Sequence, residues 1–315
     1  MSPSTAHPRG TPDLRVSFAG INLKNPVIAA SGTFGYGLEF DDVVHLNRLG
    51  GFVAKGLSKD PMAGNSTPRL YETAAGMLNA IGLQNVGVRS FVEEKLPKLR
   101  SLKDVVVFAN VFGHTRQDYE QVIQVLNEGE GIAGYELNVS CPNTTHGGIQ
   151  FGSDPRLLDE VVATAKRAAA RPLIVKLSPN VTSIALMARV AENAGADALS
   201  LVNTFVGMAI DAETRKPRIA NVTAGLSGPA IKPIALRMVY EAAQTVKIPV
   251  IGMGGISTAE DIAEFMLAGA AAVQVGTASY WDPRATEKIV DALEAWCLEH
   301  RVMRVAELTG GLGID

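Results

Sequence analysis

One apolar segment of the chain ends in a cluster of groups that can do chemistry. Tyr135 to Val139 has the β-favouring side chains of a strand, and Pro142 should end that strand because proline cannot donate a ladder hydrogen bond. Two carboxamides, a hydroxyl and a thiol follow at Asn138, Ser140, Cys141 and Asn143. A thiol among amides at a strand end is typical of an active-site edge. Cys141 is therefore the candidate base or nucleophile.

Two lysines occupy comparable positions. Lys176 lies within the apolar run Leu173–Leu177, and Lys55 ends the run that begins at Phe52. A buried lysine is rare unless it is paired. Lys176 could act as a Schiff-base nucleophile, or it could place its charge beside a cofactor ring that becomes anionic. Either lysine could instead extend its ammonium to the solvent at the rim.

A set of asparagines completes this group of polar residues. Its members are Asn79, Asn110, Asn138 and Asn203. Each carboxamide offers two donors and an acceptor oxygen. A ring of neutral amides suits a planar heterocycle with alternating C=O and N–H groups, such as a pyrimidine or a flavin. Each asparagine taken alone could also be an ordinary turn residue.

Strands and helices alternate along the chain and must position these side chains. The eight predicted strands are Val27–Ala30, Phe52–Lys55, Val105–Val111, Tyr135–Ser140, Leu173–Leu177, Ala198–Asn203, Val250–Gly254 and Ala272–Gly276. The predicted helices are Thr115–Asn127, Pro155–Ala170, Ser183–Ala194, Lys232–Thr245, Thr258–Ala268 and Thr286–Glu299. This alternation predicts an α/β fold, a (β/α)₈ TIM barrel with its site at the carboxyl ends of the strands. A doubly wound sheet is disfavoured because no G-x-G-x-x-G follows the first strand.

Glycines at the last two strand ends indicate a phosphate site. Gly254 and Gly255 end the seventh strand, and Gly276 with Thr277 ends the eighth. Barrels commonly bind phosphate between these two loops, where glycine lets the backbone approach the ligand. Gly228 could add a third backbone donor. Two ordinary tight turns would give the same pattern.

The segments between the barrel elements carry further expectations. Val16–Leu23 should form a small β-hairpin against the barrel bottom. Ser58–Leu83 lacks clear periodicity and reads as a long functional loop, and Asn143–Ser153 as a glycine-rich lid beside Cys141. Gly207–Pro229 could contain a β-excursion. We expect a disordered tail over residues 1–13 and a single barrel domain over 14–315.

Composition excludes several classes of protein. The 315 residues carry a net charge of −3, so nothing suggests binding to nucleic acid. The two cysteines, Cys141 and Cys297, cannot by themselves form a zinc or iron–sulfur site, so we expect no metal; Cys297 reads as buried packing. No apolar run approaches the roughly 20 residues of a membrane span, which makes a cytoplasmic location the expectation.

Six motifs match a known family. They are Ala54–Gly56, Asn79–Asn85, Asn138–Asn143, Lys176–Pro179, Gly252–Ile256 and Gly276–Thr277. From about Leu14 to Trp281 the chain resembles the class 1 dihydroorotate dehydrogenases, the flavin enzymes of pyrimidine biosynthesis. Cysteine at position 141 points to class 1, because the membrane-bound class 2 enzymes carry serine there. Gly147–Gly152 and Gly225–Pro233 resemble the B-type subclass.

This resemblance implies a reaction and a set of site residues. (S)-dihydroorotate would be oxidised to orotate, with Cys141 taking the C5 proton and FMN the C6 hydride. One FMN would be held by Ser31, Lys55, Gly56, Asn110, Asn138, Lys176, Val202, Gly228, Gly254, Gly255, Gly276 and Thr277. The substrate would contact Lys55, Asn79, Ala80, Ile81, Gly82, Leu83, Asn138, Asn203 and Thr204.

The B-type resemblance also implies partners. Such a catalytic subunit would form a homodimer, and a heterotetramer with a subunit that carries FAD and a [2Fe-2S] cluster and passes electrons to NAD⁺. Three alternatives stay open: an A-type, fumarate-linked enzyme, a dihydropyrimidine-type flavin oxidoreductase, and, without flavin, an aldolase that uses Lys176.

Overall fold

Eight parallel strands close into a barrel in the computed structural model, which describes residues 10–102, 104–139 and 151–314. The strands follow one another around the barrel in the order β10-β15-β16-β3-β4-β7-β8-β9. Their bounds are β3 Val27–Ala29, β4 Gly51–Val53, β7 Val106–Val111, β8 Gly134–Asn138, β9 Leu173–Lys176, β10 Ala198–Leu201, β15 Val250–Met253 and β16 Ala270–Val275. All eight predicted strands and the predicted barrel are confirmed.

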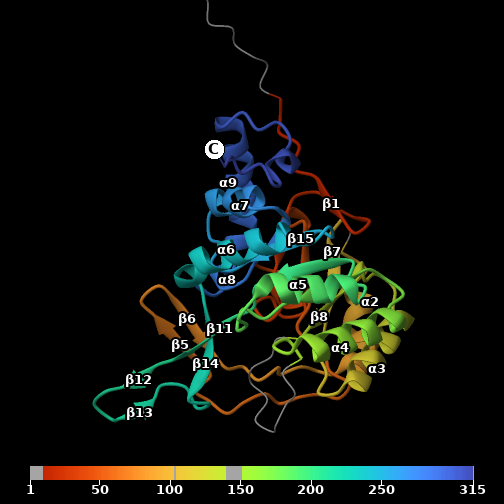
Figure 1. Ribbon diagram of the computed structural model, residues 1–315, viewed down its shortest axis with the longest axis vertical. Helices are drawn as coiled ribbons and strands as arrows, with labels where there is room; N and C mark the ends of the chain where they lie inside the picture. The colour runs from red at the N-terminus through yellow and green to blue at the C-terminus, as the bar shows by residue number, and fades with distance from the viewer. Residues whose placement is uncertain (1–9, 103, 140–150, 315) are drawn as a thin grey trace, which may run out of the picture.

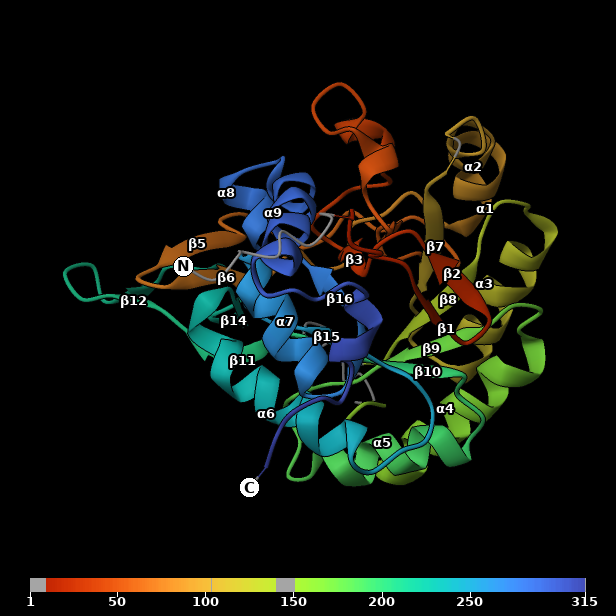
Figure 2. The same cartoon turned by 90° about the horizontal axis from the view of Figure 1, so that it is seen from above.

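Helices surround the strands, as Figures 1 and 2 show. The main ones are α3 Arg116–Glu128, α4 Pro155–Ala168, α5 Ile184–Asn193, α6 Lys232–Ala243, α7 Ala259–Leu267 and α9 Ala285–Glu299. Each matches a predicted helix to within two residues at either end. A short α8 (Ala278–Trp281) precedes α9, and short 3₁₀ turns lie at η1 Leu38–Phe40, η2 Leu46–Arg48, η4 Pro229–Ile231 and η5 Val305–Leu308.

The helical segment between β6 and β7 was not predicted. It consists of α1 (Val88–Ser90), the π-helical η3 (Phe91–Lys95) and α2 (Leu96–Leu99). Pro97 lies in the first turn of α2. Proline inside a helical pattern interrupts the backbone hydrogen bonds, which hid this helix in the sequence.

Side-chain caps are present at the amino ends of several barrel helices. Thr115 and Thr258 each form a reciprocal capping box, with Asp118 and Asp261 respectively. Asp154 accepts from the backbone N–H of Leu157 at 2.9 Å. Because these caps satisfy amides that have no partner inside the helix, they define where each helix starts after its βα-loop.

A second, smaller sheet lies beside the barrel mouth. It is antiparallel, in the order β11-β14-β6-β5, with bounds β5 Leu70–Thr73, β6 Gly76–Asn79, β11 Phe205–Met208 and β14 Thr223–Ser227. The expectation of an irregular loop over Ser58–Leu83 is therefore wrong in part, because pairing with the distant β14 orders β5 and β6. The predicted β-excursion within Gly207–Pro229 is confirmed, and it also contains the hairpin of β12 (Ile210–Asp211) and β13 (Lys216–Pro217).

The predicted N-terminal hairpin is confirmed as β1 (Val16–Phe18) and β2 (Ile21–Leu23). Phe18 stacks on Phe108 of β7 with the ring centroids 6.1 Å apart. Ile21 lies against Gly134, the first residue of β8. These contacts cover the amino end of the barrel, opposite the carboxyl ends of the strands.

The barrel closes where its last strand meets its first. β16 pairs with β3 in parallel. Outside the strands, the backbone N–H of Asp13 donates to Met303 at 2.8 Å, and that of Val305 donates to Asp13 at 2.9 Å. The beginning and the end of the barrel are thus hydrogen-bonded to each other.

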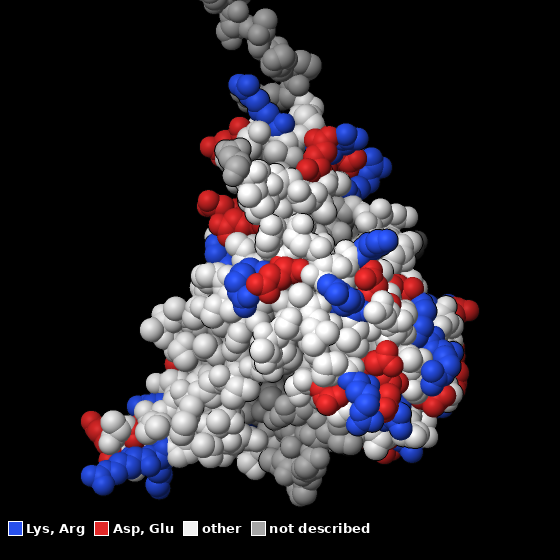
Figure 3. Space-filling model, in the orientation of Figure 1, with Lys and Arg blue, Asp and Glu red and all other residues white. Residues whose placement is uncertain are grey.

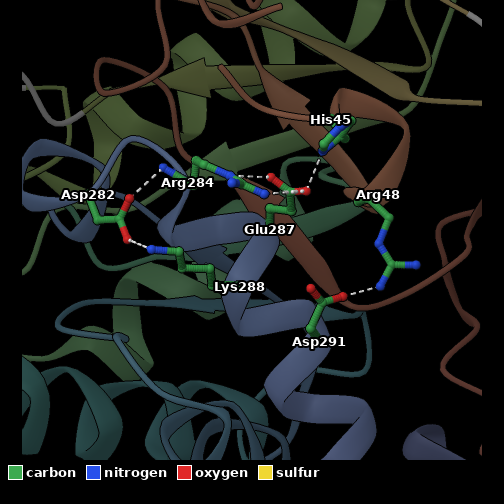
Figure 4. Close-up of polar contacts among 7 residues, drawn as sticks. All are labelled: His45, Arg48, Asp282, Arg284, Glu287, Lys288 and Asp291. Carbon is green, nitrogen blue, oxygen red and sulfur yellow. Dashed lines mark hydrogen bonds and ion pairs between the residues drawn. The ribbon is translucent and has the colours of Figure 1, made fainter. Parts of the chain in front are cut away.

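Ion pairs reinforce this closure, as Figure 4 shows. Glu287 of α9 is 5% exposed and receives hydrogen bonds from His45 at 2.6 Å and from Arg284 at 3.1 Å. Arg48 of η2 pairs with Asp291 one turn further along α9. These contacts fasten the last helix to the connection between the first two barrel strands.

The surface carries mixed charge. On the face in Figure 3, Lys and Arg intermingle with Asp and Glu over α3 and α4, where Arg116 and Arg156 both pair with Glu160. The region of β11 and β14 is largely uncharged in the same view. Across the described residues, no helix combines the length and the hydropathy that crossing a membrane requires.

Candidate active site

A cavity opens at the carboxyl ends of the barrel strands, and residues from all eight of these ends line it. Nineteen predicted cofactor and substrate residues lie in described ranges, and all except Ala80 line the cavity: Ser31, Lys55, Gly56, Asn79, Ile81, Gly82, Leu83, Asn110, Asn138, Lys176, Val202, Asn203, Thr204, Gly228, Gly254, Gly255, Gly276 and Thr277. Ala80 is instead fully buried in a small apolar cluster with Leu78, Ile219 and Ala224. The sequence thus identified the wall of one cavity from segments far apart in the chain.

Strand register brings the polar floor of this cavity together. Asn110 of β7 lies beside Glu136 of β8, and Lys176 of β9 lies between Asn138 and Ser200 of the neighbouring strands. Because side chains of a strand alternate between the two faces, residues at matched positions point into the barrel together. A polar layer results inside an otherwise apolar barrel.

Glu136 is the centre of this layer and is fully buried. Its Oε1 accepts from Asn110 Nδ2 at 2.7 Å and lies 3.6 Å from Lys176 Nζ. Its Oε2 accepts from Gln274 Nε2 at 2.5 Å and from Ser200 Oγ at 3.0 Å. Glu136 thus has an opposite charge and three hydrogen bonds in the interior, and Lys176 has Glu136 as its counter-charge, as a buried ion pair requires.

Two amide oxygens of the floor have no hydrogen-bond partner within the described part of the chain. They are Asn110 Oδ1 and Gln274 Oε1, both buried, on residues that line the cavity. An unsatisfied buried acceptor costs free energy of about 1–3 kcal/mol. Because both residues line the cavity, these two carboxamides make its floor polar and incompletely paired.

The rim is fixed by hydrogen bonds among its own residues. Ser31 Oγ donates to the carbonyl of Ala54 at 2.8 Å, which joins the ends of β3 and β4. Thr277 Oγ1 donates to Ser227 Oγ at 2.8 Å, which joins the end of β16 to the small sheet. These bonds hold the loops around the cavity in place before any ligand binds.

The glycines of the predicted phosphate loops differ in what requires them. Gly254 and Gly255 have φ angles of 129° and 78°, and an added Cβ would meet other atoms at 2.5 and 2.8 Å. The fold itself therefore requires glycine at both. At Gly276 an added Cβ would find nothing closer than Ala30 Cβ at 3.5 Å, an ordinary contact. A ligand against this backbone would explain that glycine.

Lys55 is half-buried at the cavity wall. Burial, together with the nearby charge of Arg69, lowers the pKa of Lys55 below its ordinary value of 10.5. Its backbone N–H donates to Gly35 at 2.8 Å, which fixes the start of the loop. A cation with a lowered pKa gains from any anion that binds beside it.

Only one of the two cysteines, Cys297, lies within the described residues. Cys141 and the predicted lid up to residue 150 lie outside the described residues. Cys297 is fully buried in α9, and burial raises the pKa of its thiol to about 11. Cys297 is therefore an inert core residue, as its sequence context predicted.

Sequence patterns did not indicate the cavity residues Gln274, Ser227 and Tyr280, or Glu136, which lies beneath the cavity and supports its floor. A signal existed for two of them. Glu136 and Gln274 interrupt apolar strands in the same way as Lys176 does, and buried charges are rare unless paired. When one buried strand contains a single lysine and another a single glutamate, an ion pair between the two side chains is the expected arrangement.

The fold and the cavity define a (β/α)₈ barrel protein whose ligand site lies at the carboxyl ends of the strands. The family model described as dihydroorotate dehydrogenase matches residues 13–297. The chain therefore belongs to the dihydroorotate dehydrogenase family. This confirms the family and the class of enzyme that the motifs indicated.

Individual relatives are similar over nearly their whole length. The chain is 62% identical to a protein of Solibacter usitatus named "Putative dihydroorotate dehydrogenase A (fumarate)", over 96% of this chain and 99% of the relative. It is 55% identical to the dihydroorotate dehydrogenase B (NAD(+)) catalytic subunit of Pelobacter propionicus, and 54% identical to that of Geobacter sulfurreducens, with the same coverage. Relatives named for both electron acceptors thus match this chain.

Proposed function

We propose that the chain is the catalytic subunit of a B-type dihydroorotate dehydrogenase, which oxidises (S)-dihydroorotate to orotate in pyrimidine biosynthesis with FMN. The cavity carries this proposal: the carboxamides of Asn79, Asn110, Asn138 and Asn203 line it together with two lysines. These groups suit planar rings with alternating C=O and N–H groups, which flavin and pyrimidine share.

The described residues fit an FMN in the cavity. Asn110, Asn138 and Lys176 would contact the ring system, with Ser31, Lys55, Gly56 and Val202 around it. Gly228, Gly254, Gly255, Gly276 and Thr277 would hold the phosphate. When bound, FMN supplies a hydride acceptor. The Lys176 ammonium would favour negative charge on the nearby ring. An ammonium paired with Glu136 is not a nucleophile, which disfavours the aldolase alternative.

The substrate would lie between the cofactor and the small sheet. Asn79 comes from β6, Ile81, Gly82 and Leu83 follow it, and Asn203 and Thr204 follow β10. Orotate and dihydroorotate carry a carboxylate that uracil-type rings lack. Lys55 is half-buried with a lowered pKa and would gain from pairing with that carboxylate. This favours dihydroorotate over an uncharged dihydropyrimidine.

Cys141 would be the general base. Dihydroorotate must lose a proton from C5 and a hydride from C6, so a base and a hydride acceptor are both needed. An ordinary cysteine titrates near 8.5, so turnover should rise with pH toward that range unless neighbours stabilise the thiolate.

The expected electron acceptor is NAD⁺, reached through a partner subunit that carries FAD and a [2Fe-2S] cluster. Support comes from the names of relatives at 54–55% identity. The fumarate-linked relative at 62% identity makes the A-type the second candidate. Co-purification of a second, iron-containing subunit would support the B-type. Fumarate-dependent turnover by the chain alone would overturn it.

The expected assembly, a homodimer within a heterotetramer, needs an apolar surface. Val206 and Met208 alternate along β11 and are 52% and 50% exposed, and Ile210 and Val222 nearby are 58% and 47% exposed. Exposed apolar groups that gather at one place commonly mark an interface. We assign this surface to contacts between subunits.

The function is tested with purified protein and the Cys141→Ala variant. The wild type should be yellow and should convert dihydroorotate to orotate. The variant should keep FMN and orotate binding but lose most turnover at neutral pH. Cys297→Ala is the matched control and should keep turnover, since Cys297 lies in the core. A wild-type protein that cannot bind FMN would overturn the proposal.

A further inference from the structure

Glu136 lies beneath the cavity without lining it, and none of the proposed contacts to FMN or substrate uses it. Glu136 is fully buried, and Lys176 is only 5% exposed. The Lys176 Nζ atom lies 3.6 Å from Oε1 of Glu136. Burying a carboxylate is costly even when it is paired, and an apolar side chain of similar size would avoid that cost. The position therefore calls for an explanation beyond packing.

The contacts of Glu136 match an ionised carboxylate. One oxygen faces the amide nitrogen of Asn110 and the ammonium of Lys176, and the other faces the amide nitrogen of Gln274 and the hydroxyl of Ser200. All four groups can donate. An ionised carboxylate only accepts, so it is complementary to this set of neighbours.

Two consequences reach the cavity through residues that line it. Because Asn110 and Gln274 turn their NH₂ groups toward Glu136, this carboxylate fixes the orientation of two carboxamides that line the cavity. In addition, the negative charge of Glu136 offsets the positive charge of Lys176, so the field in the cavity is weaker than that of a lone ammonium. Charges that close in a dry interior act strongly on each other and on their surroundings.

We propose that Glu136 is a positioning residue that fixes the amides of the cavity floor and, by offsetting Lys176, lowers the reduction potential of bound FMN. This proposal rests on the proposed function. Lys176 favours the reduced cofactor, and Glu136 limits that effect. The potential is therefore set by the pair, and neither residue sets it alone.

A double-mutant cycle measured by spectroelectrochemical titration of the FMN-loaded protein tests this. Glu136→Gln should raise the equilibrium constant for two-electron reduction by about tenfold, or about 30 mV. Lys176→Gln should lower it by about tenfold. The double variant Glu136→Gln/Lys176→Gln restores a neutral pair and should lie within about threefold of the wild type.

The cycle stays decisive if one single variant fails to fold. Removing one partner of a buried pair is strongly destabilising, whereas replacing both is tolerated far better. If Lys176→Gln and the double variant have equal potentials, the charge of Glu136 does not reach the cofactor and the proposal is overturned. If Glu136→Gln folds but Lys176→Gln does not, equal potentials of wild type and Glu136→Gln overturn it.

A control separates charge from hydrogen bonding. Ser200→Ala removes a donor to Glu136 but leaves both charges, so it should shift the equilibrium constant by less than about threefold. A shift as large as that of Glu136→Gln would indicate a merely structural role and contradict the proposal. If the wild type binds FMN but all variants of the cycle have its reduction potential, only this inference is refuted. If the wild type binds no FMN, the proposed function is refuted.

Discussion

Individual residues at the cavity are constrained by different physical causes. Gly254 and Gly255 are required by their backbone angles and close neighbours, whereas Gly276 has room for a methyl group. Lys55 has a lowered pKa because of burial, whereas Lys176 is held by an ion pair. Such differences separate residues that serve the fold from residues that serve a ligand, and each can be tested by a single substitution.

Gly276→Ala should weaken FMN binding and leave the fold intact. The added methyl group would meet no protein atom closer than 3.5 Å, but it would occupy the space that we assign to the cofactor phosphate. We expect the dissociation constant of FMN to rise about tenfold or more, with the unfolding free energy changed by less than about 0.5 kcal/mol. Fluorescence titration of apoprotein measures the first and urea unfolding the second. Gly313→Ala, at a glycine with open space, is the control; unchanged FMN affinity in Gly276→Ala would contradict the assignment.

The pH dependence of orotate binding should report on Lys55. Burial lowers the pKa of this lysine, so its charge is present at low pH and is lost as pH rises through a value below 10.5. The dissociation constant of orotate should therefore rise with pH, by up to tenfold per unit, starting below the usual lysine range. Measuring it in the Cys141→Ala background removes the titration of that thiol.

Two further variants make the measurement specific. In that background, Lys55→Gln should bind orotate weakly at every pH, without the alkaline rise. Lys59→Gln, at an exposed lysine outside the cavity, should behave as the Cys141→Ala parent. An alkaline rise that persists without Lys55 would exclude it as the carboxylate partner.

At the scale of elements, local sequence patterns predicted some features of the structure and missed others. Strand positions and helix lengths follow from apolar runs and caps that lie within each segment. The polar layer depends on strand register, which local patterns do not specify, so Glu136 was recognised only with the structure. The β5–β6 hairpin was missed for a related reason, since it pairs with β14, some 150 residues away. Local signals thus predicted the barrel, and long-range pairing decided the rest.

The cap of α7 offers a test at this scale. Thr258 and Asp261 form its capping box, and Asp261 also pairs with Lys232 at 2.7 Å, which ties α6 to α7 beside the loop after β15. Thr258→Ala should lower the unfolding free energy by about 1 kcal/mol, whereas Thr258→Ser should cost far less. FMN affinity should not change in either variant. Denaturant unfolding measures the difference, and equal stability of both variants and wild type would show that this cap contributes nothing.

For the whole molecule, the closure of the barrel depends in part on charge. Burial alone would raise the pKa of Glu287, but hydrogen bonds from Arg284 and His45 hold it below its ordinary value of 4.5. A carboxyl group with a lowered pKa in the folded state contributes stability above pH 4.5, and this contribution is lost as the pH falls. The contact between α9 and η2 should therefore weaken in acid.

Glu287→Gln should lower the unfolding free energy by about 1 kcal/mol at pH 7, because it removes the charge that attracts His45 and Arg284 while leaving one accepting oxygen. The difference from wild type should shrink as the pH falls below about 4.5, as the wild type loses the same contribution. Thermal or urea unfolding across this range measures it. Glu299→Gln, at an exposed position in the same helix, should show no such trend; a constant difference for Glu287→Gln would contradict the pH argument.

Backbone hydrogen bonds join Asp13 to residues 303 and 305, so the barrel is almost a continuous ring. A ring has no preferred starting point, so the order in which its β/α units are synthesised should matter little to the final fold. A circular permutant that joins the two ends by a short linker, and opens the exposed turn between β12 and β13 at Glu213, should fold and bind FMN like the parent. The cavity would then be assembled from the same eight strand ends. The cavity residues that now lie near the beginning of the chain would lie in the middle of the permuted chain.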